Sequence, residues 1–437
     1  MKKSNKRANG YRGIWYYNQP SHDEYVYKYS GGLATYCAKH IPMAWYSKES
    51  KKTFFCYGGR KRYRNRLLHM VSYFDHETGT VPRPTILLDK KTSDAHDNPT
   101  MLIDKDGYIW IFSSSHGTSR PSYIHKSSKP FRVDSFSKII KTNFSYPQCM
   151  YLSDYGFLFL HTKYMNHHRV LSFMRSKNGL KWSDRKLLSH IEKGHYQVTS
   201  FHRNKVGTAF NFHPEPGGLN YRTNLYYIET NDFGDTWCNV SGDRLKLPLN
   251  SVQNPALIHD YAKENMLVYM KDINFDRQGN PIILYVLSKG YESGPENNPR
   301  IWKTAHWNDS TWDISGDITS DSNYDTGCIH IEEDGKWRII GPTEVGPQPF
   351  NPGGEICMWI SENNGKRWEN IHQMTKNSMY NNTYVRRPMN AKAEFYAFWA
   401  DGNPRKRSES HLYFCNKAGD KVHKLPSKMR DNSRFHI

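Results

Sequence analysis

Apolar and polar residues alternate in short runs along the whole 437-residue chain, and Gly, Asp and Asn turns separate the runs. The segment MLIDKDGYIWIF (101–112) is typical: two apolar runs flank Asp-Gly, a dipeptide that favours hairpin turns. The same plan recurs at 150–164, 273–287, 328–340 and 411–425. Helical periodicity is almost absent. The pattern therefore predicts an all-β protein built from consecutive hairpins.

A second motif lies between these hairpins. TNDFGDTW (230–237) and SENNGKRW (361–368) share the pattern S/T-x-D/N-x-G-x-x-W, and SKNGLKW (176–182) is one residue shorter. We interpret each as a turn whose Trp packs against the strand that follows. The recurrence predicts a repeated all-β unit of roughly 50–60 residues, the size of a four-stranded propeller blade. About seven such units fit the chain, which predicts one seven-bladed β-propeller domain over residues 1–437 rather than a β-sandwich or tandem domains.

The charge predicts an anionic partner. The net charge is +19, and the dense basic runs are MKKSNKR (1–7), GGRKRYRNR (58–66) and NPRKRSE (403–409). Such a surplus attracts nucleic acid, a membrane surface or an acidic glycan, although each run is equally typical of a solvated surface. No nucleic-acid-binding motif accompanies the runs, so we expect an acidic oligosaccharide and no nucleic acid. Residues 1–10 are expected to form a flexible basic N-terminus.

Cysteine usage and the N-terminus predict a cellular location. The 7 cysteines never show C-x-x-C spacing, which argues against a zinc ribbon or a disulfide framework and favours a reducing compartment. The basic N-terminus is not followed by the apolar stretch of a signal peptide, and no run approaches the roughly 18 apolar residues of a membrane span. We expect a cytoplasmic protein without a membrane partner. A periplasmic or secreted location would require a signal removed from this chain.

Candidate chemistry lies at the ends of the predicted strands. His96 precedes and His116 follows one predicted hairpin, so both should reach the same end of the propeller. Tyr146 and Lys163 repeat this layout one hairpin later. Structural alternatives exist for all four: a histidine pair in a chain with 21 His is more often structural, Tyr146 could be a packed aromatic before Pro147, and Lys163 a solvated strand end.

The next predicted blade offers further polar groups at strand ends: Gln197, Asn211, His213 and Arg222. The segment 11–46 is rich in Tyr and Trp, which stack on sugar rings or pack in a core, and it contains His40. No metal-ligand spacing is diagnostic, although the late carboxylates Glu344 and Glu355 could lie near the channel. The sequence therefore requires no cofactor and leaves a structural divalent metal open.

Several of these segments resemble a known group of propellers. YRGIWYYNQPSHDEYVYKYSGGLATY, HDNPTMLIDKDGYIWIF, YPQCMYL with HTKY, and GPTEVGPQPFNPGGEICMW resemble proteins with BNR-type repeats. Among these, the chain resembles seven-bladed lyases that attack uronic-acid glycans, namely ulvan lyases and rhamnosyl-glucuronate lyases. The same superfamily includes an α-L-rhamnosidase branch. The resemblance covers nearly the whole chain.

The resemblance implies roles for individual residues. Two histidines about twenty residues apart correspond to His96 and His116, and a tyrosine proton shuttle corresponds to Tyr146. An arginine that binds the uronate carboxylate is replaced here by Lys163, a point charge rather than a bidentate fork, with Arg169 and Arg222 in reserve. In the rhamnosidase branch the catalytic histidine lies in the first-blade region, where His40 could stand.

The expected reaction is β-elimination next to a uronate. Removing the proton alpha to the carboxylate requires a base, an acid for the leaving oxygen, and strong stabilisation of the developing enediolate. Lys163, Arg222, Asn98 or His116 could stabilise it. Tyr146 or a histidine could transfer the protons if neighbouring cations lower the tyrosine pKa.

Three classes of function remain open at this point. The leading expectation is elimination on rhamnose–glucuronate, ulvan-type oligosaccharides, by an exo-acting lyase or by a dehydratase that removes water from the terminal uronate. The alternatives are an α-L-rhamnosidase and a non-catalytic propeller that binds acidic glycans. Most glycosidases need a pair of carboxylates, and no clear pair is present in the sequence.

Overall fold

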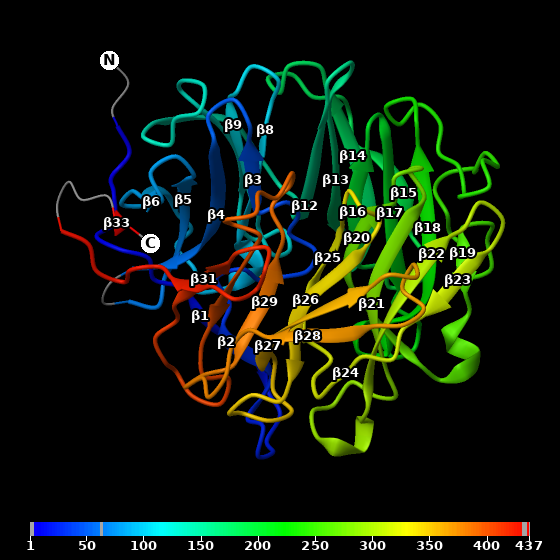
Figure 1. The fold of residues 1–437 in the computed structure, drawn as a ribbon. Coiled ribbons are helices and arrows are strands. Elements are labelled where there is room, and N and C mark those ends of the chain that lie inside the picture. Colours follow the sequence, from blue (N-terminus) through cyan, green and yellow to red (C-terminus); the bar gives the residue numbers. More distant parts are fainter. Residues whose placement is uncertain (1–3, 62–63, 431–434, 437) are drawn as a thin grey trace.

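Residues 4–61, 64–430 and 435–436 are described by a computed structural model. They form seven antiparallel blades and a separate hairpin, β1–β2, and their helices are short 3₁₀ turns (Figure 1). From blade 1 to blade 6 the first strands of consecutive blades pack side by side, and the first strand of blade 7 packs on the second strand of blade 6. A bridge between Trp45 and Met389 joins the last blade to the first. The ring is therefore closed. The predicted all-β, seven-bladed propeller is confirmed.

The first four blades follow the chain order. Blade 1 contains β3 (Ala44–Ser47), β4 (Lys52–Arg60), β5 (Leu67–Asp75), β6 (Thr80–Val81), β7 (Thr85–Asp89) and β33 (Phe435–His436). Blade 2 contains β8 (Pro99–Ile103), β9 (Ile109–Ser113), β10 (Ser122–Ser127) and β11 (Phe136–Thr142). Blade 3 contains β12 (Ser145–Leu152), β13 (Gly156–Met165), β14 (His168–Ser176) and β15 (Lys186–Ser189). Blade 4 contains β16 (Gln197–His202), β17 (Lys205–Phe212), β18 (Thr223–Thr230) and β19 (Leu257–His259).

The remaining elements complete the ring. Blade 5 contains β20 (Leu267–Phe275), β21 (Pro281–Ser288), β22 (Arg300–Trp307), β23 (Trp312–Ser315) and β24 (Thr319–Ser320). Blade 6 contains β25 (Cys328–Ile331), β26 (Trp337–Glu344), β27 (Glu355–Ser361) and β28 (Glu369–Gln373). Blade 7 contains β29 (Asn382–Arg386), β30 (Ala397–Asp401), β31 (Leu412–Cys415) and β32 (Val422–Lys424). Outside the blades are β1 (Trp15–Pro20), β2 (Tyr27–Gly32), η1 (Ala95–Asp97), η2 (Gly218–Tyr221), η3 (Tyr261–Glu264) and η4 (Pro295–Asn297).

The blade topology gives the ring two different ends. The segments that precede the first strands, and the loops between second and third strands, lie at the lower end in Figure 1. Turns between first and second strands, and between third and fourth strands, lie at the upper end. Functional side chains at the starts of first and third strands are thereby gathered at the lower end.

The turns predicted from the sequence are confirmed between third and fourth strands, whereas the packing of each Trp on the strand that follows stays a prediction. Thr230 Oγ1 accepts a hydrogen bond of 2.9 Å from the Gly234 amide, and Ser361 Oγ accepts an equivalent bond from Gly365. Gly234 has φ +83°, a left-handed conformation that glycine adopts without steric cost. The Trp237 ring packs on Phe173 of the preceding blade, with 5.5 Å between ring centroids. These turns therefore join neighbouring blades.

The N-terminal segment is bound to the propeller rather than free. Asn5 donates its amide to the Asp134 carbonyl at 2.8 Å, and Ala8 donates to Pro84 at 2.9 Å. The flexible terminus expected for residues 1–10 is therefore not seen over 4–10, where backbone bonds hold it to blades 1 and 2; residues 1–3 lie outside the described residues. No helix in the described chain is long and apolar enough to cross a membrane.

His195, buried between blades 3 and 4, is expected to make stability depend on pH. Its Nδ1 donates to the Asn211 carbonyl at 2.8 Å and its Nε2 accepts the Ile191 amide at 3.0 Å, so the ring must be neutral. Burial lowers the pKa of His195 to about 3, and the Asn211 bond opposes only part of that shift. As pH falls below about 6.5, the unfolded chain takes up a proton that the folded chain refuses. This histidine thus removes about 1.4 kcal/mol of unfolding free energy per pH unit, down to about pH 3.

The variant His195→Gln isolates this effect. Urea unfolding of both proteins should show that the stability difference between them shrinks by about 1.4 kcal/mol between about pH 6 and about pH 5. A difference that stays constant over this range would mean that His195 does not exclude the proton.

Candidate active site

A polar cavity of about 110 Å³ lies at the lower end of the ring. Its walls come from the β1–β2 hairpin, from the segment 36–39 that precedes blade 1, and from blades 2 to 7. Propellers bind ligands at such channel ends because loops of several blades converge there. The cavity brings together three of the predicted residues from two blades, His96, His116 and Tyr146, and a fourth from blade 4, Arg222.

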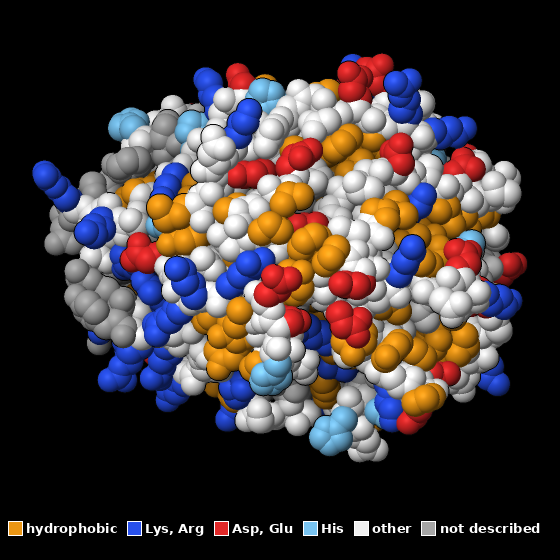
Figure 2. Space-filling view, turned by 90° about the horizontal axis from the view of Figure 1, so that it is seen from below, with side chains coloured by type: hydrophobic (Ala, Val, Ile, Leu, Met, Phe, Trp, Pro, Cys, Tyr) orange, Lys and Arg blue, Asp and Glu red, His pale blue; other side chains and the backbone are white. Residues whose placement is uncertain are grey.

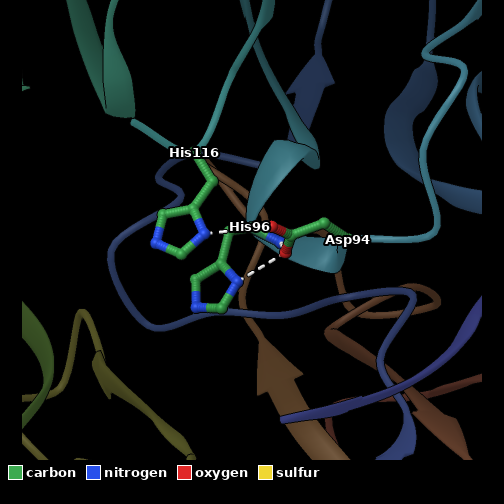
Figure 3. Close-up of side chains that lie close together, drawn as sticks. All are labelled: Asp94, His96 and His116. Carbon is green, nitrogen blue, oxygen red and sulfur yellow. Dashed lines mark hydrogen bonds and ion pairs between the residues drawn. The ribbon is translucent and has the colours of Figure 1, made fainter. Parts of the chain in front are cut away.

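His96 and His116 share one carboxylate. The Nδ1 atom of His96 lies 2.6 Å from Asp94 Oδ1, and the Nδ1 atom of His116 lies 2.9 Å from Asp94 Oδ2 (Figure 3). The two rings stack with centroids 4.0 Å apart. Asp94 caps the 3₁₀ helix η1 by accepting the His96 amide, which fixes one histidine, and His116 follows β9, as the hairpin pattern predicted. Both Nε2 atoms point away from Asp94 (Figure 3).

The protonation states in this cluster follow from burial and charge. Burial by itself would raise the pKa of Asp94, but His96 and His116 hold it below its usual range, so Asp94 is ionised. Burial, and then the charge of His116, lowers the pKa of His96 to about 4, although Asp94 opposes the shift. Because an ionised carboxylate can only accept, each Nδ1 donates a proton to Asp94. At neutral pH the His96 ring is neutral, and its Nε2 is an acceptor.

The two histidines differ in what their Nε2 atoms contact. The Nε2 atom of His96 lies 2.7 Å from the Tyr29 hydroxyl and 2.8 Å from the Tyr36 hydroxyl, and this ring is only 3% exposed. The His116 side chain is 28% exposed, and its Nε2 has no hydrogen-bond partner among the described residues. His116 can therefore exchange a proton with a ligand directly, whereas His96 positions the two tyrosines.

Tyrosines line most of the remaining wall. They are Tyr29, Tyr36, Tyr146, Tyr196, Tyr269, Tyr324 and Tyr384. The Tyr146 hydroxyl lies 3.4 Å from that of Tyr196, and the Tyr146 backbone has φ +51°, an uncommon conformation for a bulky residue that aims the ring into the wall. Burial raises the pKa of Tyr146 well above its usual value, and the Arg169 charge only partly opposes this. The effect of burial on this pKa therefore outweighs the lowering by the neighbouring cation.

Five cations reach the cavity: Lys28, Lys39, Arg169, Arg222 and Lys271. None of them forms an ion pair with a described carboxylate, and no Asp or Glu of the described chain lines the cavity. The Arg222 guanidinium lies on the Tyr269 ring, 4.5 Å from its centroid. Burial and then neighbouring cations lower the pKa of Lys28 to about 7 and that of Lys39 to about 8; for Lys39, the Cys37 thiol opposes part of the shift. An anionic ligand would relieve this repulsion.

Four predicted binding residues lie behind the wall instead of in it. The Asn98 amide donates to the Leu33 and Tyr36 carbonyls, at 2.9 and 2.8 Å, and so holds the segment that carries Tyr36. His40 is fully buried, with its Nε2 3.1 Å from the His96 carbonyl. His213 and Gln197 are also buried, and the His213 ring packs on the edge of Tyr196. These residues support the wall rather than contact the cavity.

Lys163 does not lie at the cavity, in contrast to the prediction. Its ammonium donates to Asn143 Oδ1 at 2.9 Å. In the β13–β14 pairing, Tyr164 stands opposite Arg169, and adjacent residues of a strand point to opposite faces. Arg169 therefore shares the Tyr164 face, with its guanidinium 5.3 Å from the Tyr164 ring centroid, and Lys163 faces away. The cation that blade 3 contributes to the cavity is Arg169.

The structural divalent metal that the sequence left open stays a prediction without assigned ligands. Asp94, His96 and His116 are the group in the described part of the chain whose ligand atoms lie within 4.8 Å of one another. Hydrogen bonds account for this geometry, and Arg120 already donates to Asp94 at 3.2 Å, where it would repel a metal cation. Glu355 accepts from the Ser378 amide at 2.7 Å, Glu344 is exposed, and neither lines the cavity.

Sequence reasoning missed several cavity residues. They are Asn18, Gln19, Lys28, Tyr29, Tyr36, Lys39, Tyr196, Tyr269, Lys271, Asn323, Tyr324 and Tyr384. One signal was available: Lys271 and Asp272 interrupt the apolar run at the start of β20, and Lys271 is 2% exposed in the structure. A charge inside an apolar strand requires a functional or structural reason. The tyrosines carry no comparable signal, because Tyr is common throughout this chain.

Two curated ulvan lyases are similar to this chain in sequence. An ulvan lyase of Nonlabens ulvanivorans is 24% identical over 321 residues, covering 64% of this chain and 65% of that protein. Ulvan Lyase-PL25 of Pseudoalteromonas sp. (strain PLSV) is 23% identical over 262 residues, covering 52% and 53%. The matched parts thus span less than two thirds of either relative.

Solved structures agree on the fold. The PL25 ulvan lyase structure superposes with a TM-score of 0.72 at 16% identity, covering 94% of this chain and 96% of that one. The structure of that lyase bound to -[GlcA(1-4)Rha3S]- superposes with a TM-score of 0.73 at 15% identity, again covering 94% of this chain and 96% of that one. Residues 43–317 match the BNR repeat-containing family, and the resemblance noted in the sequence is confirmed. The chain belongs to the BNR repeat-containing family.

Proposed function

We propose that this protein is a lyase that cleaves uronate-containing, ulvan-type oligosaccharides by β-elimination. The observation that carries the proposal is the cavity itself, where five cations without carboxylate partners surround a histidine and a tyrosine that can move protons. Cations that are buried and unpaired destabilise the empty protein, so such a cluster indicates an anionic ligand. The relatedness to ulvan lyases supports a uronate as that anion.

Arg169 and Arg222 are the proposed carboxylate ligands. A guanidinium offers two parallel donors that match a carboxylate and stays charged at every relevant pH. Both arginines stand on tyrosine rings, which fixes their orientation before a ligand binds. As the alpha proton leaves, negative charge accumulates on the uronate carboxylate, and fixed cations stabilise this enediolate more than the ground state.

His116 and Tyr146 are the proposed proton-transfer groups. His116 offers a free Nε2 lone pair, which suits a base that removes the alpha proton. Burial keeps the Tyr146 hydroxyl protonated at neutral pH, which suits an acid for the departing glycosidic oxygen. The carbon–hydrogen electron pair forms the new double bond while the carbon–oxygen bond breaks. The products are an unsaturated uronate and a shortened sugar chain.

The alternative reactions have weaker support. Glycoside hydrolysis usually needs two carboxylates on either side of the bond, and none of the described residues places a carboxylate on the cavity wall. His40, the residue that would favour a rhamnosidase, is buried behind the wall. Elimination of water from a terminal uronate would use the same groups, but the two ulvan lyases compared above do not support it.

The proposal is tested by incubating the protein with ulvan oligosaccharides while recording ultraviolet absorbance and product masses. We expect growth of the unsaturated-uronate band together with shortened chains. An unsaturated product lighter by one water, without chain shortening, would replace the lyase by a dehydratase. Released rhamnose without the band would contradict elimination altogether.

A further inference from the structure

Two basic runs that stood apart in the sequence meet in the structure. The first run, 58–66, begins in β4, and its described residues 61 and 64–66 lie between β4 and β5 of blade 1. The second run, 403–409, lies between β30 and β31 of blade 7. Blades 1 and 7 are neighbours because the ring closes there. Both loops connect a second strand to a third strand, so both lie at the end of the ring that holds the cavity.

Direct contacts join the two loops. Arg60 of blade 1 forms an ion pair of 3.7 Å with Glu409 of blade 7. Gly13 lies between them, with a backbone bridge to Gly59 and a 2.9 Å hydrogen bond to the Ser410 carbonyl. A Cβ added at Gly13 would lie 2.3 Å from Ser410 Oγ, so a larger residue here would force the Ser410 side chain to move. The contacts make one continuous surface.

We call this surface the rim patch and define it by its cations: Arg60, Lys61, Arg64, Arg66, Arg405, Lys406 and Arg407. Two carboxylates pair with it, Glu409 with Arg60 and Asp89 with Arg66. Lys61, Arg64, Lys406 and Arg407 are exposed and form no ion pair with described residues. Figure 2 looks onto this end of the ring and shows Lys and Arg side chains gathered on its left, over blades 1 and 7.

The β1–β2 hairpin connects the rim patch to the cavity. On one side Trp15 donates its Nε1 to the Asn403 carbonyl at 2.8 Å, beneath the blade 7 loop. The Tyr17 ring packs at a tilt against Trp15 and Tyr27, with centroids 5.8 and 4.8 Å apart, and Tyr17 is 48% exposed. On its other side the same hairpin supplies Lys28 and three further residues to the cavity wall. An exposed tyrosine between two cationic surfaces suits a sugar ring between two anionic groups.

We propose that the rim patch and Tyr17 form an exosite that holds an anionic polysaccharide chain while one of its uronates occupies the cavity. This inference rests on the proposed function. The rim patch carries seven cations and two carboxylates, so it concentrates a polyanion and slows its dissociation. Because the four free cations are exposed, salt screens the attraction. The exosite therefore distinguishes long chains from short ones, whereas the cavity recognises both.

The test compares two fourfold variants of the full-length protein. The first is Lys61→Ser, Arg64→Ser, Lys406→Ser and Arg407→Ser. The matched control removes four exposed cations from turns at the opposite end of the ring: Lys177→Ser, Lys181→Ser, Lys366→Ser and Arg367→Ser. Initial rates are measured on polymeric ulvan and on an ulvan tetrasaccharide at low and at moderate salt.

We expect the first variant to raise KM for the polymer about tenfold at low salt, while kcat/KM for the tetrasaccharide stays within about twofold. Added salt should bring the wild type toward the variant. The control variant should match the wild type on both substrates. Equal losses on polymer and tetrasaccharide, or an equal loss in the control, would overturn the exosite.

A binding measurement separates this inference from the proposed function. Mobility of the wild type and both variants is compared in native gels that contain ulvan polysaccharide or duplex DNA. If ulvan retards the first variant less than it retards the wild type and the control, the exosite is supported. That result would hold even if no substrate is cleaved, in which case only the lyase proposal fails. Unchanged retention by ulvan, or tighter retention by DNA than by ulvan, overturns the exosite as an acidic-glycan site.

Discussion

His116→Ala is expected to lower kcat on ulvan oligosaccharides by about 10³-fold, within the range that general acid–base groups contribute. The reason is positional: His116 offers the cavity an Nε2 lone pair, and Asp94 fixes its tautomer through Nδ1 at 2.9 Å. Fold and thermal midpoint should change little, because the side chain is 28% exposed and leaves no large void. The rate is followed by the absorbance of the unsaturated product.

Two companion variants make the result specific. Asp94→Asn keeps the shape of the cluster but removes the charge that orients both histidines, and we expect it to lower kcat by about 10²-fold or more. His372→Ala removes an exposed histidine of β28 and should be silent. Near-normal turnover by His116→Ala would remove this residue from the mechanism. Partial rescue of His116→Ala by free imidazole would support its role as a base.

Arg169→Ala and Arg222→Ala are each expected to lower kcat/KM on uronate substrates by about 10²- to 10³-fold, the usual effect of losing one donor that stabilises developing negative charge. Each guanidinium is oriented by tyrosine rings, with 5.6 Å from Arg169 and 5.2 Å from Arg222 to the Tyr196 centroid. Lysine at either position keeps the charge but loses the fork, so Arg169→Lys and Arg222→Lys should recover only part of the rate.

Lys163→Ala is the matched control, because it removes a cation from the same blade that faces away from the cavity. We expect nearly normal kcat/KM for it. Thermal midpoints of all variants check that the fold survives. A ligand whose uronate carboxylates have been reduced to alcohols should bind the wild type weakly. It should bind the two Arg→Ala variants with the same weak affinity, because it has no carboxylate for the arginines to contact. A large effect of Lys163→Ala, with little effect of Arg169→Ala, would return the carboxylate clamp to Lys163.

Local sequence patterns were sufficient to predict the strands and turns of the blades. Asp-Gly in 101–112 closes β8 and β9, and the S/T-x-D/N-x-G-x-x-W turns form where predicted, because their hydrogen bonds lie within five or six consecutive residues. The blade count followed from repeat length, since each blade is one local meander. The single hairpin between His96 and His116 likewise made their meeting foreseeable, as a strand, a turn and a returning strand bring both ends together.

Other parts of the site depended on which face of a strand a residue occupies. The prediction assigned the carboxylate-binding cation to Lys163 instead of Arg169. Because β13 and β14 pair with Tyr164 opposite Arg169, Arg169 lies on the cavity face of the sheet and Lys163 on the other face. Asn98, His40, His213 and Gln197 were predicted to bind the substrate, but the structure buries them behind the cavity wall. The position of a residue at a strand end predicts at which end of the channel it lies. Only the packing between blades decides whether its side chain reaches the channel surface.

The sequence alone thus determined the all-β class, the seven blades, and the meeting of His96 with His116 at one channel end. Tertiary structure alone decided the cation set, because Lys28, Lys39, Arg169, Arg222 and Lys271 come from five separate segments that converge only when the ring closes. It also joined the basic runs near 60 and 405 into one rim patch. Both depend on contacts between residues far apart in the chain, and no local pattern encodes such contacts.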